Sequence, residues 1–215
     1  MASAKNLIFR YHAFQLGALN FTIHRGDRIA LIGANGSGKT TLLNLLAGLK
    51  KQASGELDVR APKERIALLG EHVQFPSHWP LVTCVRSYLA LKKTGLNVSS
   101  ARLVGSPEKE RAWRRTTFSD GSKGMKIQAL LRGIQLQAPD FLICDEPSSG
   151  LDPFYQQELL RFLSSYPGTL IMSTHYFSEM QKLEWTHTWL LKDGKMDEIL
   201  TPRSATEWER AFDLV

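Results

Sequence analysis

The sequence predicts an α/β fold with a mixed core sheet, an N-terminal antiparallel β layer and an inserted helical subdomain. Short apolar runs, which are typical of buried strands, alternate with longer runs at helical spacing. This alternation stops between residues 72 and 120, where the pattern is helical. With 215 residues, of which 43% are hydrophobic, the chain is long enough for one large core. We therefore expect a single domain over residues 1–215, with a core of about 1–71 and 121–215 and a helical subdomain of about 72–120.

The N-terminal layer comes first in the chain. Apolar and polar residues alternate up to Tyr11 and again up to Ile23, which is typical of two half-buried antiparallel strands. Tyr11 ends the first of them. An aromatic side chain at this place is either a core residue or a ring on which an adenine base stacks.

A glycine-rich turn then joins a buried strand, residues 28–32, to an amphipathic helix over residues 41–49 that includes Leu49 on its apolar face. The turn has the pattern G-x-x-x-x-G-K-T. Its glycines let backbone N–H groups turn toward a polyphosphate, and the following helix N-terminus favours an anion. A purely structural turn would not require Lys and Thr directly after its last glycine. We therefore predict a P-loop nucleotide site in which Lys39 reaches the β- and γ-phosphates and Thr40 ligates Mg²⁺. The residues expected to surround the phosphates are Gly33, Asn35, Gly36, Ser37, Gly38, Lys39, Thr40 and Thr41.

Two further strands are expected at residues 55–59 and 66–69, and the insertion that follows carries helices over 83–93 and 108–116. A helix over 126–137 comes after the insertion. Ser122 is a good N-cap for it, and Gly124 permits a close backbone approach. This block is either an ordinary capped helix or a second anion site.

The buried strand expected over residues 141–146 ends in two adjacent acids, Asp145 and Glu146. Buried strands rarely end in paired carboxylates without a charged partner. Beside a phosphate loop, Asp145 is expected to ligate Mg²⁺ and Glu146 to polarise an attacking water. Two acids in a structural turn are the alternative.

A polar turn and a helix to about residue 165 follow, and the apolar strand 169–174 then ends at His175. This histidine is either a structural cap or a hydrogen-bond partner of a terminal phosphate. A strand over 188–191, a turn at 192–195 and a helix over 205–212 complete the domain.

Charge, cysteine content and hydropathy limit the functions that the chain can have. The net charge of +6 permits nucleic acid or an anionic membrane surface as a partner. The densest basic cluster, Lys109 to Arg115, is interleaved with acids, which favours a solvated helix face. Cys84 and Cys144 fit no metal spacing and are expected to be packing residues. No apolar run approaches the roughly 20 residues of a membrane span, so we expect a cytosolic chain.

The order of these motifs resembles that of the ATP-binding-cassette (ABC) ATPases over essentially the whole chain. The stretch GANGSGKT, residues 33–40, is similar to the Walker A loop, and FLICDE, 141–146, is similar to Walker B with its catalytic glutamate. Residues 149–152 resemble the D-loop. The block GSKGM, 121–125, stands where the family signature LSGGQ belongs.

The resemblance also assigns roles to single residues. His175 resembles the switch histidine and Tyr11 the adenine-stacking aromatic. Glu71 stands near the position of the family's glutamine loop, with Gln74 as a shifted substitute, which would make Glu71 a ligand of Mg²⁺. The signature departs from the family at Gly121, Lys123 and Met125, as in prokaryotic exporter-type cassettes.

What the resemblance implies is an ATP hydrolase that needs ATP, Mg²⁺ and a second copy of itself. In the family two cassettes pack head to tail, so Ser122 and Gly124 would bind the γ-phosphate held by the partner copy. Hydrolysis reopens the dimer and moves separate multi-span permease subunits. We therefore expect an export-type transporter subunit, peripheral on the cytoplasmic face of the membrane, with no nucleic-acid partner.

Two other classes remain open from the sequence. A soluble ABC-family ATPase that acts on nucleic acid or ribosomes would explain the basic charge, but such proteins usually carry two cassettes or a coiled-coil insertion. A P-loop kinase or unrelated NTPase would lack the GSKGM block and a histidine at the end of the strand.

Overall fold

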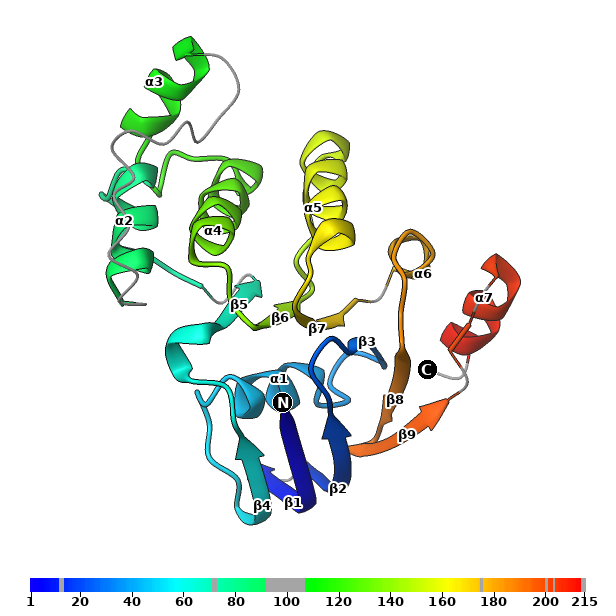
Figure 1. Cartoon of the computed structure of the whole chain (residues 1–215). Coiled ribbons are helices and arrows are strands. Elements are labelled where there is room, and N and C mark those ends of the chain that lie inside the picture. Colours follow the sequence, from blue (N-terminus) through cyan, green and yellow to red (C-terminus); the bar gives the residue numbers. More distant parts are fainter. Residues whose placement is uncertain are drawn as a thin grey trace.

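A computed structural model describes residues 1–11, 14–70, 73–91, 107–174, 176–199, 201–202 and 204–213. Its main sheet has the strand order β5-β6-β7-β3-β8-β9, in which neighbours are parallel except for the antiparallel pair β8 and β9 (Figure 1). The predicted mixed α/β sheet is therefore confirmed. The strands are β3 (Arg28–Ile32), β5 (Ile66–Gly70), β6 (Phe141–Asp145), β7 (Thr169–Ser173), β8 (His187–Lys192) and β9 (Lys195–Ile199).

The N-terminal antiparallel layer is also confirmed. In this smaller sheet β1 (Ala2–Tyr11) pairs with β2 (Phe14–Ile23) on one side and with β4 (Ser54–Val59) on the other. Helix α1 (Lys39–Leu46) packs between the two sheets, because its leucines share one apolar cluster with residues of β1, β2, β3 and β6. Burial of this helix on both sides fixes the loop that precedes it.

The other face of the main sheet is covered by helices, which Figure 1 shows side by side above β5, β6 and β7. A short 3₁₀ turn, Lys63–Arg65, leads into β5. A separate small hydrophobic cluster packs against β3 and β8 and contains Met180 and Trp208. The helices are α2 (Leu81–Leu91), α3 (Pro107–Arg115), α4 (Lys123–Gln137), α5 (Pro153–Ser165), α6 (Phe177–Met180) and α7 (Ala205–Asp213).

Some predicted boundaries are wrong. Helix α1 ends at Leu46, since Gly48 adopts φ 71° and turns the chain, so Leu49 is 65% exposed rather than buried. Helix α4 begins three residues earlier than predicted, because the Ser122 hydroxyl accepts from the Met125 N–H at 3.2 Å. The sequence prediction also missed β9, a polar strand with no apolar run, and the four-residue helix α6.

The helical insertion is present as α2 and α3. Trp113 of α3 and the apolar residues of α2 belong to the same buried cluster as α4 and α5. The insertion therefore shares its hydrophobic core with the main domain. That residues 72–120 form a subdomain stays a prediction. None of the helices in the described ranges combines the length and the apolar character that a membrane crossing requires.

Candidate nucleotide site

The phosphate loop lies between the end of β3 and the start of α1, as the sequence predicts. Gly36 and Gly38 adopt φ 84° and 109°, a left-handed conformation that glycine accepts without strain. A Cβ at Gly33 would collide with the Leu191 carbonyl oxygen. Within the described residues no side chain caps α1, whose first residues follow Gly38. The free N–H groups of this first turn are therefore available to an anion.

Lys39 places its ammonium group inside this loop. The side chain is only 5% exposed, and Nζ donates to the carbonyl oxygens of Gly33 at 2.7 Å and Ala34 at 3.1 Å. Glu146 Oε1 lies 3.9 Å from Nζ. Burial lowers the pKa of Lys39, and the charges of Glu146 and Asp145 partly oppose this shift. The buried ammonium is thus held in place before any ligand arrives.

The two predicted acids lie where β6 ends. Asp145 is buried, and its Oδ1 accepts from the Ser173 hydroxyl at 2.8 Å. The Glu146 N–H donates to both the carbonyl oxygen and Oγ of Ser173, at 3.1 Å each. Glu146 has φ 45°, a conformation that is strained for a residue with a side chain and is common at functional sites. Ser173 therefore positions both acids, and the sequence analysis did not single it out.

The parallel order of the sheet explains why these groups meet. β7 lies between β6 and β3, so Asp145 pairs in register with Ser173 and the ends of all three strands share one edge. The carboxyl ends of parallel strands are where ligands bind in open α/β sheets. Lys39 and the two acids are distant in sequence but adjacent at this edge.

Lys39 and Glu146 border a cleft of about 240 Å³. Tyr11 lines it and is 62% exposed, so the ring is not a core residue. Ser37 lies in the loop beside the cleft, and its Oγ is buried with no hydrogen-bond partner among the described residues. A buried hydroxyl without a partner fits a site that a polar ligand completes. The lining residues are Tyr11, Phe14, Asn35, Gly36, Gly38, Lys39, Thr40, Thr41, Lys50 and Glu146.

Other predicted site residues do not join this cleft. Ser122 is exposed at the start of α4, and Gly124 lies against the Tyr155 ring, so neither is among the residues that line it. Glu71 and His175 lie outside the described residues, and their assigned roles stay predictions. Phe14 and Lys50 line the cleft although the sequence analysis did not single them out.

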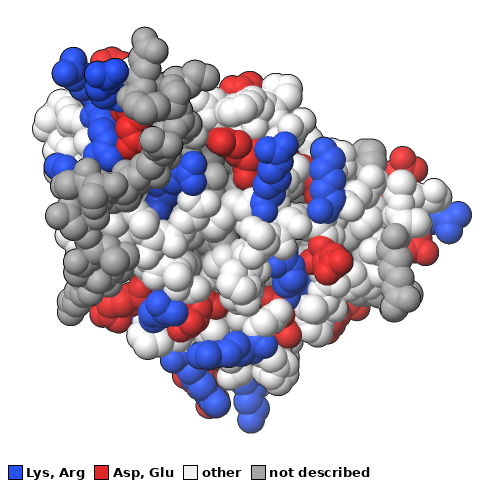
Figure 2. All heavy atoms as spheres, turned by 45° about the horizontal axis from the view of Figure 1, so that its top comes forward, with Lys and Arg blue, Asp and Glu red and all other residues white. Residues whose placement is uncertain are grey.

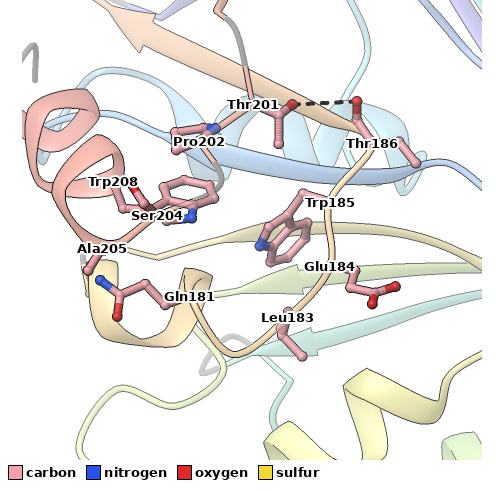
Figure 3. A pocket seen from close by; sticks show the side chains of 10 residues that line it. All are labelled: Gln181, Leu183, Glu184, Trp185, Thr186, Thr201, Pro202, Ser204, Ala205 and Trp208. Atoms are coloured by element: carbon pink, nitrogen blue, oxygen red, sulfur yellow. Dashed lines mark hydrogen bonds between the residues drawn. The ribbon is translucent and has the colours of Figure 1, made fainter.

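A larger hollow of about 830 Å³ lies elsewhere, between the segment before β8 and the start of α7. Figure 3 shows Trp185 and Trp208 bordering it, with Gln181 at the side. In the part of the chain that the structure describes, its lining contains no lysine, arginine or glycine. It therefore offers no cationic side chain to a phosphate, whereas the smaller cleft combines two lysines with a glycine-rich loop, so the smaller cleft is the candidate site.

The fold and this site define a P-loop nucleotide-binding domain. The family model that matches the chain is that of the ABC transporters, over residues 16–149. The chain belongs to this family. The predicted class, an ABC-type ATP hydrolase, is confirmed at the level of the family.

Curated relatives include the bacitracin transport ATP-binding protein BcrA of Bacillus licheniformis. It is 29% identical over 196 residues, which cover 84% of this chain and 62% of the relative. The Nod factor export ATP-binding protein I of Cupriavidus pinatubonensis is 33% identical, and the match covers 77% of this chain and 55% of that protein. This chain thus spans less than two thirds of either relative.

Solved structures agree on the fold. The ATP-binding subunit of an ABC transporter is similar over 99% of both chains, with a TM-score of 0.76 and 24% identity. An ATP-binding cassette solved as a dimer in a post-hydrolysis state, bound to ADP and Pi, has a TM-score of 0.74 and 18% identity. That match covers 93% of this chain and 99% of the cassette. The predicted ABC ATPase fold is confirmed.

Proposed function

We propose that this chain binds ATP in the 240 Å³ cleft and hydrolyses it to drive a membrane ABC transporter. The observation that carries the proposal is the convergence of Lys39 with Asp145 and Glu146 at one edge of the sheet, with 3.9 Å between Lys39 Nζ and Glu146 Oε1. Tyr11 stacks the adenine base and the loop holds the phosphates. Glu146 polarises the attacking water, and His175 contacts the terminal phosphate.

The donor set fits Mg²⁺, which prefers oxygen ligands. Thr40 follows Lys39 at the cleft, and the buried carboxylate of Asp145 lies at the end of β6. These two residues would hold the ion, with Glu71 as a third ligand. The ion would supply positive charge that offsets the charge of the bound phosphates.

The site of one chain is completed by a second copy. Ser122 and Gly124 do not line the cleft of their own chain, and Ser122 is exposed at a helix N-terminus. Head-to-tail packing of two copies brings this block onto the γ-phosphate held by the partner, and ATP closes the dimer.

The transporter partner is a separate multi-span permease, and this chain lies peripherally on the cytoplasmic face of the membrane. The direction is export, which rests on the relative named for Nod factor export. On the face that Figure 2 shows, basic side chains of the described residues are interspersed with acidic ones. This arrangement does not favour the phosphate backbone of a nucleic acid as the partner.

The test is purification of the tagged chain from detergent-solubilised cells, with identification of its partners and an ATPase assay. We expect a multi-span membrane protein and Mg²⁺-dependent ATP hydrolysis. Recovery of ribosomes or nucleic acid without a membrane protein would replace the transporter with a soluble ABC ATPase. Absence of ATP binding would overturn the site itself.

A further inference from the structure

Lys50 is a second lysine at the cleft, on the side of Tyr11. It is exposed and follows the end of α1. Its Nζ lies 5.0 Å from the centroid of the Phe9 ring and 5.8 Å from that of the Tyr11 ring. It also lines the same cleft as Lys39. The cleft therefore has two lysines, Lys39 within the phosphate loop and Lys50 on the side of Tyr11.

The two lysines are held in different ways. Lys39 is buried, and its Nζ donates to two carbonyl oxygens of the loop. Lys50 is exposed and lies over two rings, and such exposed cation–π contacts are weak. A phosphate oxygen is a stronger partner for an ammonium group than a ring face. The charge of Lys50 is therefore available to an anionic ligand.

A nucleotide bound in this cleft would extend from the Tyr11 ring to the loop around Lys39. With the base on Tyr11 and the β- and γ-phosphates in the loop, the ribose and the α-phosphate lie between them. Lys50 contacts the Phe9 ring more closely than the Tyr11 ring, so it keeps a ring partner when a base covers Tyr11. We infer that Lys50 binds the α-phosphate of the nucleotide. This inference rests on the proposed ATP site.

The test compares Lys50→Ala with Lys51→Ala. Lys51 is the adjacent exposed lysine and does not line the cleft. Affinities for ATP, ADP, AMP and adenosine are measured by competition against a fluorescent ATP analogue. We expect Lys50→Ala to weaken ATP, ADP and AMP by the same factor of about five, the size of an exposed charge pair, and to leave adenosine unchanged. The difference should shrink at high salt because screening weakens exposed charge pairs. Lys51→Ala should match the wild type.

Other outcomes are decisive. An equal loss for adenosine would mean that Lys50 only orders the Tyr11 ring. A loss confined to ATP would place Lys50 at the γ-phosphate, and a loss for ATP and ADP but not for AMP would place it at the β-phosphate; each of these results overturns the inference. If Lys50→Ala binds all four ligands as the wild type does, the inference fails while the ATP site stands. If the wild type and Lys51→Ala both fail to bind ATP, the proposed function fails as well.

Discussion

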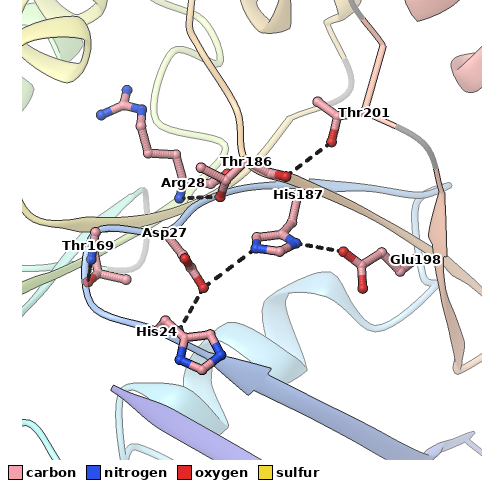
Figure 4. A network of polar contacts seen from close by, with 9 residues as sticks. His24, Asp27, Arg28, Thr169, Thr186, His187, Glu198 and Thr201 are labelled. Atoms are coloured by element: carbon pink, nitrogen blue, oxygen red, sulfur yellow. Dashed lines mark hydrogen bonds and ion pairs between the residues drawn. The ribbon is translucent and has the colours of Figure 1, made fainter.

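Both ends of the parallel strands carry charged side chains, and their surroundings differ. At the start of β3 the Arg28 guanidinium donates to the carbonyl oxygens of Leu163, Tyr166 and Glu184, at 2.9, 3.1 and 2.8 Å. Nearby, the His187 ring lies between two carboxylates, as Figure 4 shows. Its Nδ1 lies 2.6 Å from Glu198 Oε1, and its Nε2 lies 3.6 Å from Asp27 Oδ2. These polar groups are paired within the chain.

At the opposite end of the same strands the pairing is incomplete. The Ser37 hydroxyl is buried with no partner in the described part of the chain, and the first turn of α1 has no side-chain cap there. Glu146 is held in a strained conformation beside the buried Lys39. Polar groups that a chain pairs internally stabilise its fold, whereas a partnerless buried group in a loop beside a cleft fits a site that a polar ligand completes. Substitutions at the two ends should therefore separate activity from stability.

The largest effect is expected from Glu146→Gln. The amide cannot polarise the attacking water, so ATP turnover should fall by about 10²-fold or more, while ATP binding persists and an ATP-loaded dimer accumulates. Steady-state ATPase assays and size-exclusion chromatography with ATP measure both. The matched control is Glu198→Gln at the other end of the sheet, which should keep turnover within about twofold. Normal hydrolysis by Glu146→Gln would remove this residue from catalysis.

Arg28→Met is expected to lower stability while leaving ATP binding unchanged. This change removes the guanidinium donor from three carbonyl oxygens, of which that of Leu163 still accepts from the Tyr166 N–H, so the free energy of unfolding should fall by about 2–4 kcal/mol. The affinity for ATP, measured well below the melting temperature, should change little. Urea denaturation measures the loss of stability. Arg25→Met is the control, because Arg25 is exposed and its replacement should cost under about 0.5 kcal/mol. If ATP affinity falls while stability is unchanged, then the residues at the starts of the strands do not act on stability alone, and the proposed contrast between the two ends of the sheet is wrong.

The sequence was sufficient for features that depend on local pattern. The loop, the buried strand before the paired acids and the cap at Ser122 all follow from neighbouring residues, and the structure has them where they are predicted, with the strand ending one residue earlier, at Asp145. Ser173 and Lys50 were missed because their roles arise from strand register and from packing between distant segments. Leu49 was misplaced because helical spacing continues past the glycine that ends α1. Local pattern thus predicts the motifs, and only the assembled sheet shows which residues position them.

The smallest change in stability is expected for the ion pair between Arg65 and Asp140, near the starts of β5 and β6. Arg65 donates to both carboxylate oxygens of Asp140, at 3.1 Å from Nε and 2.9 Å from the terminal nitrogen. These hydrogen bonds lower the pKa of Asp140. A carboxyl group with a lowered pKa adds stability that is present above its ordinary pKa, near 4, and is lost as the pH falls through the lower value in the folded state.

Asp140→Asn should therefore reduce the free energy of unfolding at pH 7 by about 0.5–1 kcal/mol, since the pair is partly exposed. The difference from the wild type should hold down to about pH 4 and narrow below it. Urea denaturation of both proteins between pH 7 and pH 3 measures this. A difference that is constant across that range would mean that the hydrogen bonds of Asp140 stabilise the fold independently of its charge. Because the pair lies away from the cleft, ATP affinity at pH 7 should be the same in both proteins, which separates this end of the sheet from the nucleotide end.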